Sequence, residues 1–174
     1  LKQFAQQTTA DNVVVGMVSS DDDAPGITDS YALKGSTVME EQLCGNKILF
    51  STYSFFQNNT KMAEAMVKHC NSVLQQYQTQ QATLLDVYGG AGTFGICLAE
   101  LFKRTLIIDT EGPNIRCAEE NIKNNGLEKV QAVRGDAAVL GKMAAKAGIR
   151  GELFAITDPP RIGMGQKAIK ALVD

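Results

Sequence analysis

The fold of this chain is decided by one stretch, Leu84-Leu85-Asp86-Val87-Tyr88-Gly89-Gly90-Ala91-Gly92-Thr93-Phe94-Gly95. Its apolar first half has the composition of a buried strand, and its glycine-rich half leads into a helical pattern. Glycines let a ligand approach the backbone closely, and the first turn of a helix offers unpaired N–H groups to a negatively charged group. The spacing Gly90-x-Gly92-x-x-Gly95 fits a dinucleotide fingerprint, and a purely structural tight turn is the alternative.

Strand-like and helix-like patterns alternate around this stretch. Before it, apolar residues at helical spacing predict a helix that begins after Asn58 or Asn59, either of which can cap it. The expected strands are Thr83–Val87, Thr105–Asp109, Lys129–Val133 and Leu153–Thr157, and the expected helices between them are Thr93–Phe102, Pro113–Asn124 and Ala137–Ala147. This alternation is typical of a doubly wound parallel sheet, so the sequence predicts an α/β, Rossmann-like fold.

The residues before this alternating pattern differ from it in composition and spacing. The β-branched run Val13–Val18 predicts a strand, and the acidic, proline-containing residues 21–26 predict an exposed turn after it. Short segments punctuated by glycines follow between Tyr31 and Thr52 and suggest further strands. We therefore expect a β-containing lead-in segment over residues 1–52 and a ligand-binding domain over residues 53–174.

Composition narrows the class of protein. The 174 residues include 44% hydrophobic residues and carry a net charge of −2, which favours one globular domain and argues against a strongly basic nucleic-acid binder. No apolar run is long enough for a membrane span. The four cysteines lie at least 20 positions apart, so no CxxC pair can hold a metal, and reduced thiols suggest a cytoplasmic protein.

Carboxylates follow three of the expected strands. Asp109 stands 17 positions after Gly92, where it can bind the ribose hydroxyls of an adenosine, as both NAD and S-adenosylmethionine (SAM) enzymes require. Glu111 is better explained as a charge at a helix N-terminus. Asp136 can accept a hydrogen bond from an adenine amino group or cap the next helix, and both roles stay open.

The fourth expected strand leads into Asp158-Pro159-Pro160-Arg161. An acidic residue followed by two prolines at this edge is common in methyltransferases that act on nucleobases or amides, whereas a dehydrogenase has no need for it. Arg161 can bind a phosphate group through its guanidinium. A basic stripe at Lys142, Lys146 and Arg150 is read as a solvated helix face rather than an RNA contact.

Three motifs in order resemble the SAM-dependent RNA uracil-C5 methyltransferases, the tRNA and 23S rRNA m5U family. They are Phe55-Phe56-Gln57-x-Asn59, Asp86-x-Tyr88-x-Gly90-x-Gly92-Thr93-Phe94 and Asp158-Pro159-Pro160-Arg161-x-Gly163, and the resemblance runs from about Tyr31 to the end. It implies a class I SAM-dependent methyltransferase fold, SAM as cofactor, no metal, and a role in tRNA or rRNA processing. Two departures are Gly89, where many members carry Cys, and Asp109, where many carry Glu.

The resemblance also assigns roles to single residues. It places Gln57 and Asp158 at the boundary between cofactor and target base as catalytic residues, and Arg161 near RNA. The implied cofactor-binding residues are Gln57, Asp86, Tyr88, Gly90, Gly92, Thr93, Asp109, Asp136 and Asp158. We expect these side chains to gather at the carboxyl ends of the strands.

The family's nucleophile is a cysteine that attacks C6 of uracil, and it lies in a Ser-Cys-Asn-Pro-like segment beyond the Asp-Pro-Pro-Arg motif. We expect this chain to end before that segment and before the general base, so that it binds cofactor without turnover. A strand left at an exposed sheet edge would then favour self-association. The alternatives are another SAM methyltransferase that modifies an exocyclic amine, an NAD(P)-binding domain, and a non-catalytic SAM-binding or RNA-interaction module.

Overall fold

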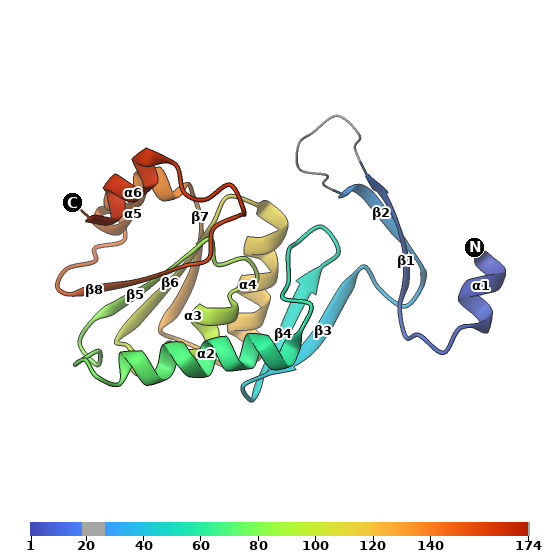
Figure 1. The fold of residues 1–174 in the computed structure, drawn as a ribbon, viewed down its shortest axis with the longest axis horizontal. Helices are drawn as coiled ribbons and strands as arrows, with labels where there is room; N and C mark the ends of the chain where they lie inside the picture. The colour runs from blue at the N-terminus through green and yellow to red at the C-terminus, as the bar shows by residue number, and fades with distance from the viewer. Residues whose placement is uncertain (19–26, 174) are drawn as a thin grey trace.

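The computed structural model describes residues 1–18 and 27–173, and the acidic turn predicted for residues 21–26 lies outside the described residues. Its centre is a four-stranded parallel sheet in the order β7-β6-β5-β8 (Figure 1). The strands are β5 (Thr83–Val87), β6 (Arg104–Asp109), β7 (Val130–Arg134) and β8 (Leu153–Thr157). Each lies within one residue of its predicted bounds. The α/β, Rossmann-like class of fold is therefore confirmed.

Helices cover both faces of this sheet because successive strand residues point to opposite sides. Leu84 and Ile107 face the first cluster of buried residues, and Leu85 and Ile108 face the second. The first cluster lies under α2 (Thr60–Leu74), α3 (Thr93–Cys97) and α4 (Gly112–Asn124), and the second under α5 (Leu140–Lys146) and α6 (Gln166–Val173). Each fully buried aliphatic side chain contributes roughly 2 kcal/mol to the hydrophobic term.

Two helices differ from the sequence prediction. The helix predicted over Thr93–Phe102 breaks at Leu98 and continues as a 3-10 turn, η1 (Ala99–Leu101). The helix predicted over Ala137–Ala147 begins as another 3-10 turn, η2 (Ala137–Val139), before α5. Leu98 and Ala99 at the first break and Ala137 at the second are buried, so tertiary packing overrides helix propensity in both segments.

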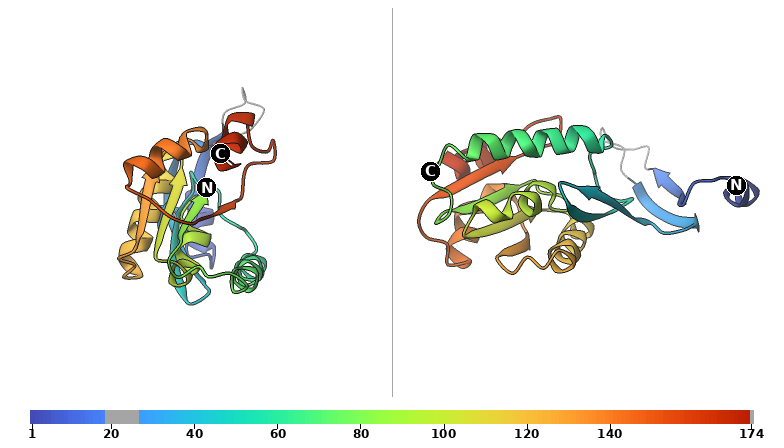
Figure 2. Two further views of the ribbon diagram at one scale, coloured as in Figure 1. Left: turned by 90° about the vertical axis from the view of Figure 1, so that its left-hand side faces the viewer. Right: turned by 90° about the horizontal axis from the view of Figure 1, so that it is seen from below.

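The long helix α2 begins as predicted. Asn59 caps it, since the Asn59 side-chain oxygen accepts a hydrogen bond from the backbone N–H of Met62 at 3.0 Å. The helix runs along the length of the sheet (Figure 2). Ala63, Val67 and Leu74 form its buried face. Among the described residues, no helix has the length and apolar character needed to cross a bilayer.

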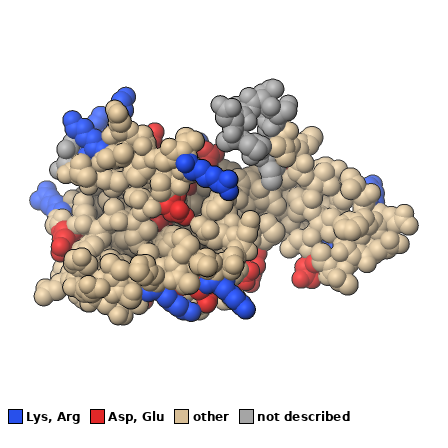
Figure 3. All heavy atoms as spheres, viewed as in Figure 1, with Lys and Arg blue, Asp and Glu red and all other residues tan. Residues whose placement is uncertain are grey.

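The N-terminal segment is built of two antiparallel ribbons. The helix α1 (Lys2–Gln7), which was not predicted, precedes β1 (Val13–Val18), which pairs with β2 (Ile27–Lys34). This ribbon extends from one end of the molecule (Figures 1 and 2). On the face seen in Figure 3, its described atoms carry few charged groups.

The second ribbon, β3 (Val38–Leu43) with β4 (Asn46–Ser51), belongs to the same core as the sheet. Leu43 and Ile48 are fully buried there. Asn121 of α4 fastens the ribbon, because its side chain accepts from Leu49 N at 2.7 Å and donates to Leu49 O at 2.8 Å. The domain boundary near residue 52 stays a prediction.

Candidate functional site

The glycine-rich turn after β5 is shaped by the residues beneath it. The Asp86 carboxylate is 1% exposed, and its Oδ2 accepts a hydrogen bond from Gly95 N at 2.7 Å. A Cβ on Gly95 would lie 2.6 Å from Ile107 Cγ1 and 2.9 Å from Asp86 Oδ2. Glycine is therefore required at position 95 because a buried acid and a core isoleucine leave no room for a side chain.

The environment of Asp86 is unusual for a carboxylate. Burial raises the pKa of this carboxyl to about 7, the Gly95 hydrogen bond opposes the shift, and the negative charges of Asp109 and Asp158 add to it. The side chain supports the turn from below. Direct contact of Asp86 with a cofactor stays a prediction.

Three backbone positions in the turn, Tyr88, Gly90 and Gly92, adopt positive φ angles. Gly92, the residue before α3, has φ 92°, which glycine adopts at little cost. Tyr88 has φ 61° although it carries a side chain, and such strain in a non-glycine residue often accompanies a binding site. No pattern in the sequence indicates the strain at Tyr88.

Asp109 ends β6 beside the turn, at the position predicted for it. Its Oδ2 accepts from Gly90 N at 2.9 Å, and its Oδ1 accepts from Glu111 N at 2.8 Å. A carboxylate offers about four lone-pair sites, so both oxygens retain acceptor capacity for hydroxyl groups of a ligand. The hydrogen bond to Gly90 fixes this acid against the glycine turn.

Gln57 and Asp158 meet at the same edge although they are 101 positions apart in sequence. Gln57 Nε2 donates to Asp158 Oδ2 at 3.0 Å. Together with the turn they enclose a hollow of about 50 Å³, lined by Phe55, Phe56, Gln57, Tyr88, Gly89, Gly90, Ala91, Thr93, Phe94 and Asp158. Five of the predicted site residues, Gln57, Tyr88, Gly90, Thr93 and Asp158, thus line one hollow.

The other predicted site residues, Asp86, Gly92, Asp109, Asp136 and Arg161, do not line this hollow. Asp136 follows β7 and caps η2, because its Oδ1 accepts from Ala138 N at 2.8 Å, so the capping role left open by the sequence is confirmed. Glu111 occupies the N-cap position of α4 without capping it through its side chain. Arg161 is exposed in the connection between β8 and α6.

The phenylalanines that line the hollow were not among the predicted ligands. Phe55 is 72% exposed, whereas Phe56 is buried and stacks on Phe50 with ring centroids 4.0 Å apart. Their position next to Gln57 in the sequence was the available signal. The described residues contain no group of three or more His, Cys, Asp or Glu side chains that could hold a metal ion.

The cysteines lie elsewhere in the fold. Cys44 occupies the turn between β3 and β4, and Cys70, Cys97 and Cys117 lie on α2, α3 and α4. Burial raises the pKa of all four thiols, that of Cys97 to about 12. They are therefore protonated near neutral pH, and none of them lines the hollow.

Comparison with known proteins assigns the chain to a family. The sequence profile of the tRNA (Uracil-5-)-methyltransferase family matches residues 33–174. The chain belongs to this family. The assignment confirms the resemblance drawn from the three motifs and groups the chain with methyltransferases rather than with dehydrogenases.

Two bacterial relatives are both named uncharacterized RNA methyltransferases. A protein of Protochlamydia amoebophila is 34% identical over 125 residues, which is 71% of this chain and 28% of the relative. A protein of Caldanaerobacter subterraneus is 32% identical over 145 residues, which is 82% of this chain and 30% of the relative. The chain thus spans less than a third of the length of these two relatives.

A solved structure matches nearly the whole fold. The Pyrococcus abyssi tRNA (uracil-54, C5)-methyltransferase, crystallised with S-adenosyl-L-homocysteine, superimposes with a TM-score of 0.68 at 24% identity. The match covers 96% of this chain and 39% of that protein. At this level of identity the comparison shows a shared fold.

Proposed function

We propose that this chain is the cofactor-binding part of a SAM-dependent RNA methyltransferase that methylates C5 of uracil in tRNA or rRNA. The observation that carries the proposal is the Gln57–Asp158 hydrogen bond, which joins two motifs 101 positions apart beside the glycine turn. Membership of the tRNA (Uracil-5-)-methyltransferase family supports the same chemistry.

The residues at this edge fit an adenosine-containing cofactor. Asp109 retains acceptor capacity for ribose hydroxyls. A Cβ on Gly90 would find only Phe55 O nearby, at 3.8 Å, so the backbone there is open to a ligand. The hollow of about 50 Å³ holds only part of such a molecule. We therefore propose that the rest extends along the strand ends toward Asp109 and Asp136.

SAM, when bound, supplies an electrophilic methyl group. Gln57 and Asp158 then define where the acceptor ring lies, because an amide and a carboxylate together offer donors and acceptors to a base. A stacked uracil is inaccessible, so the target nucleotide must leave its stack to reach them. Arg161, exposed beside this edge, is proposed to contact a phosphate of the same RNA.

The covalent step of uracil methylation needs a thiolate that attacks C6. The four thiols of this chain are protonated near neutral pH and lie away from the hollow. We therefore propose that this chain binds the cofactor and does not by itself complete methyl transfer.

Calorimetric titration with S-adenosylhomocysteine tests the proposal, with NAD as the competing ligand. We expect S-adenosylhomocysteine to bind and NAD not to bind. Asp109→Ala should weaken binding at least tenfold because the ribose loses a charged acceptor. Glu119→Ala, which removes an exposed acid on α4, is the matched control and should bind as the unmodified chain does. Preference for NAD, or equal loss in both variants, would contradict the proposal.

A further inference from the structure

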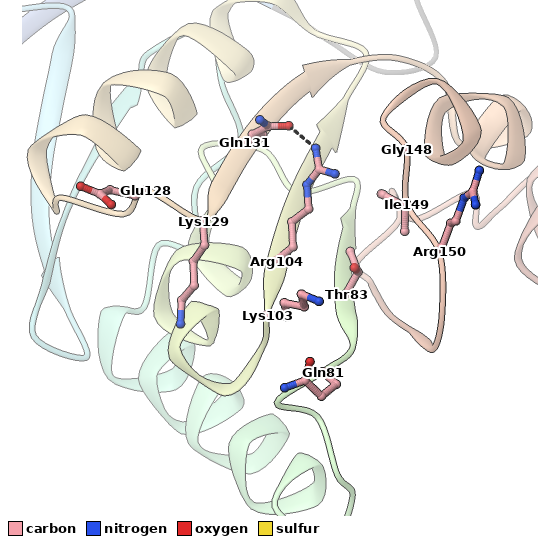
Figure 4. A pocket seen from close by; sticks show the side chains of 10 residues that line it. All are labelled: Gln81, Thr83, Lys103, Arg104, Glu128, Lys129, Gln131, Gly148, Ile149 and Arg150. Atoms are coloured by element: carbon pink, nitrogen blue, oxygen red, sulfur yellow. Dashed lines mark hydrogen bonds between the residues drawn. The ribbon is translucent and has the colours of Figure 1, made fainter.

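A second hollow, of about 430 Å³, lies at the opposite end of the sheet. Its walls come from the segments that lead into all four parallel strands (Figure 4). The residues that line it are Gln81, Thr83, Lys103, Arg104, Glu128, Lys129, Gln131, Gly148, Ile149 and Arg150. At about 3.3 Å per residue, the five residues of β5 separate it from the glycine turn by roughly 17 Å.

The hollow is strongly basic, although the whole chain carries a net charge of −2. Lys103, Arg104, Lys129 and Arg150 line it together with a single acid, Glu128. Figure 4 shows the Glu128 carboxylate turned outward, away from Arg104. Positive charge concentrated in a concave site attracts anions.

Arg104 supplies a fixed positive charge at the centre. Its Nη1 donates to Ala147 O and its Nη2 to Gln131 Oε1, both at 2.7 Å. Both acceptors are neutral, so they orient the guanidinium without cancelling its charge. The orientation matters because a planar guanidinium that is already held loses little entropy when an anion binds.

The other cationic side chains of the hollow differ in whether they already form an ion pair. Lys129 forms an ion pair with Glu100 at 3.3 Å, so part of its charge is satisfied. Lys103 and Arg150 are exposed and have no acid within ion-pair distance among the described residues. These two side chains are therefore free to bind a ligand.

The chain path explains how Arg150 reaches this site. The sequence places it in a stripe with Lys142 and Lys146, but α5 ends at Lys146. Gly148, with φ 66°, then turns the chain, and Arg150 stands on the wall of the hollow opposite Lys129 (Figure 4). Of the three residues in that stripe, only Arg150 lines the hollow.

The walls are held by backbone hydrogen bonds between neighbouring segments. Thr83 N donates to Glu152 O, Lys103 N to Ala82 O and Thr105 N to Lys129 O, each at 3.0–3.1 Å. The hollow is therefore formed before any ligand arrives, and binding need not order the loops.

We propose that this hollow is a phosphate-binding site, with the hydrogen-bonded Arg104 at its centre and the exposed Lys103 and Arg150 as its further contacts. The same chemistry could be presented by the backbone of an RNA or by a free phosphate. The RNA source rests on the proposed function, since an RNA whose target base lies at the glycine turn can extend over the roughly 17 Å to this end of the sheet.

The test measures binding of two probes, inorganic phosphate and a fluorescent single-stranded oligouridylate, over a range of salt concentrations. The variant is Lys103→Glu/Arg150→Glu, and the matched control is Lys170→Glu, an exposed lysine on α6. Circular dichroism confirms that each variant is folded. Titration with S-adenosylhomocysteine runs in parallel to monitor the cofactor edge.

We expect the double variant to bind at least tenfold more weakly, with the salt slope of RNA binding reduced by about 0.7 for each phosphate that it no longer neutralises. Lys170→Glu should bind as the unmodified chain does. Weaker binding of RNA alone identifies the RNA backbone as the ligand, and weaker binding of both probes identifies a general phosphate site. Absence of binding, or equal binding by all variants, would overturn the inference. Failure of S-adenosylhomocysteine to bind would instead contradict the proposed function and leave this site standing.

Discussion

At the scale of single residues, Asp86 makes stability depend on pH. Its folded pKa of about 7 lies above the ordinary value of 3.8, so the folded state binds more protons than the unfolded state between these values. The free energy of unfolding is therefore highest below about pH 4 for this group and falls as the pH rises through 7. Urea denaturation of the unmodified chain and of Asp86→Asn at pH 5 and pH 8 measures this contribution. The amide variant should lose less stability over that interval, and an identical loss would contradict the pKa assignment.

A pair of glycines tests the packing beneath the turn. Gly95→Ala forces a Cβ against Ile107 and Asp86, and we expect it to cost about 1–3 kcal/mol of unfolding free energy. Gly141 lies in α5 with nothing within 4 Å of an added Cβ, so Gly141→Ala should stabilise by about 0.5–1 kcal/mol. Thermal denaturation compares the two. Similar melting temperatures would mean that the turn tolerates a side chain.

At the scale of elements, α4 ties the β3–β4 ribbon to the glycine turn through one side chain. Fully buried Asn121 bonds both backbone groups of Leu49 and also donates to Ala91 O at 3.0 Å. Asn121→Ala leaves these groups unpaired and should cost about 2–4 kcal/mol. Asn125→Ala is the control, because its bonds to Lys47 are exposed and water can replace them. Equal costs for the two substitutions would contradict this account.

The strands of the sheet could be predicted from sequence because burial dictates their composition. Every residue of β5 is buried, and three of its five residues, Leu84, Leu85 and Val87, are apolar. Helix ends and breaks could not be predicted as well. The break at Leu98 depends on packing against residues distant in sequence, and α1 has no buried face beyond Ala5 to give it a periodic pattern.

Part of the candidate site could be predicted because the strands could be predicted. Parallel topology brings Asp109 and Asp158 to one edge, so the positions of the acids followed from the strand assignments. The hydrogen bond between Asp158 and Gln57 and the positive φ of Tyr88 are tertiary features. The basic hollow could not be predicted from the sequence because its four cations come from three segments of the chain, at residues 103–104, 129 and 150.

At the scale of the whole molecule, β8 forms one edge of the sheet and exposes apolar surface. Leu153 is 46% exposed there, and an open edge can pair with a second copy. We expect the weight-average molecular mass measured by sedimentation equilibrium to rise with protein concentration. Leu153→Lys should reduce this rise. Val73→Lys is the control, because Val73 is 40% exposed but lies on α2. A concentration-independent monomer would contradict self-association.

The central claim is that the cofactor binds at the edge where the glycine turn, Asp109 and the Gln57–Asp158 pair meet. Amide hydrogen exchange with and without S-adenosylhomocysteine tests it most directly, because it locates binding along the backbone. The account predicts slower exchange at residues 89–94 and 109–111, with residues 148–150 of the basic hollow unchanged. Binding without protection of residues 89–94, or protection confined to the opposite end of the sheet, would contradict it.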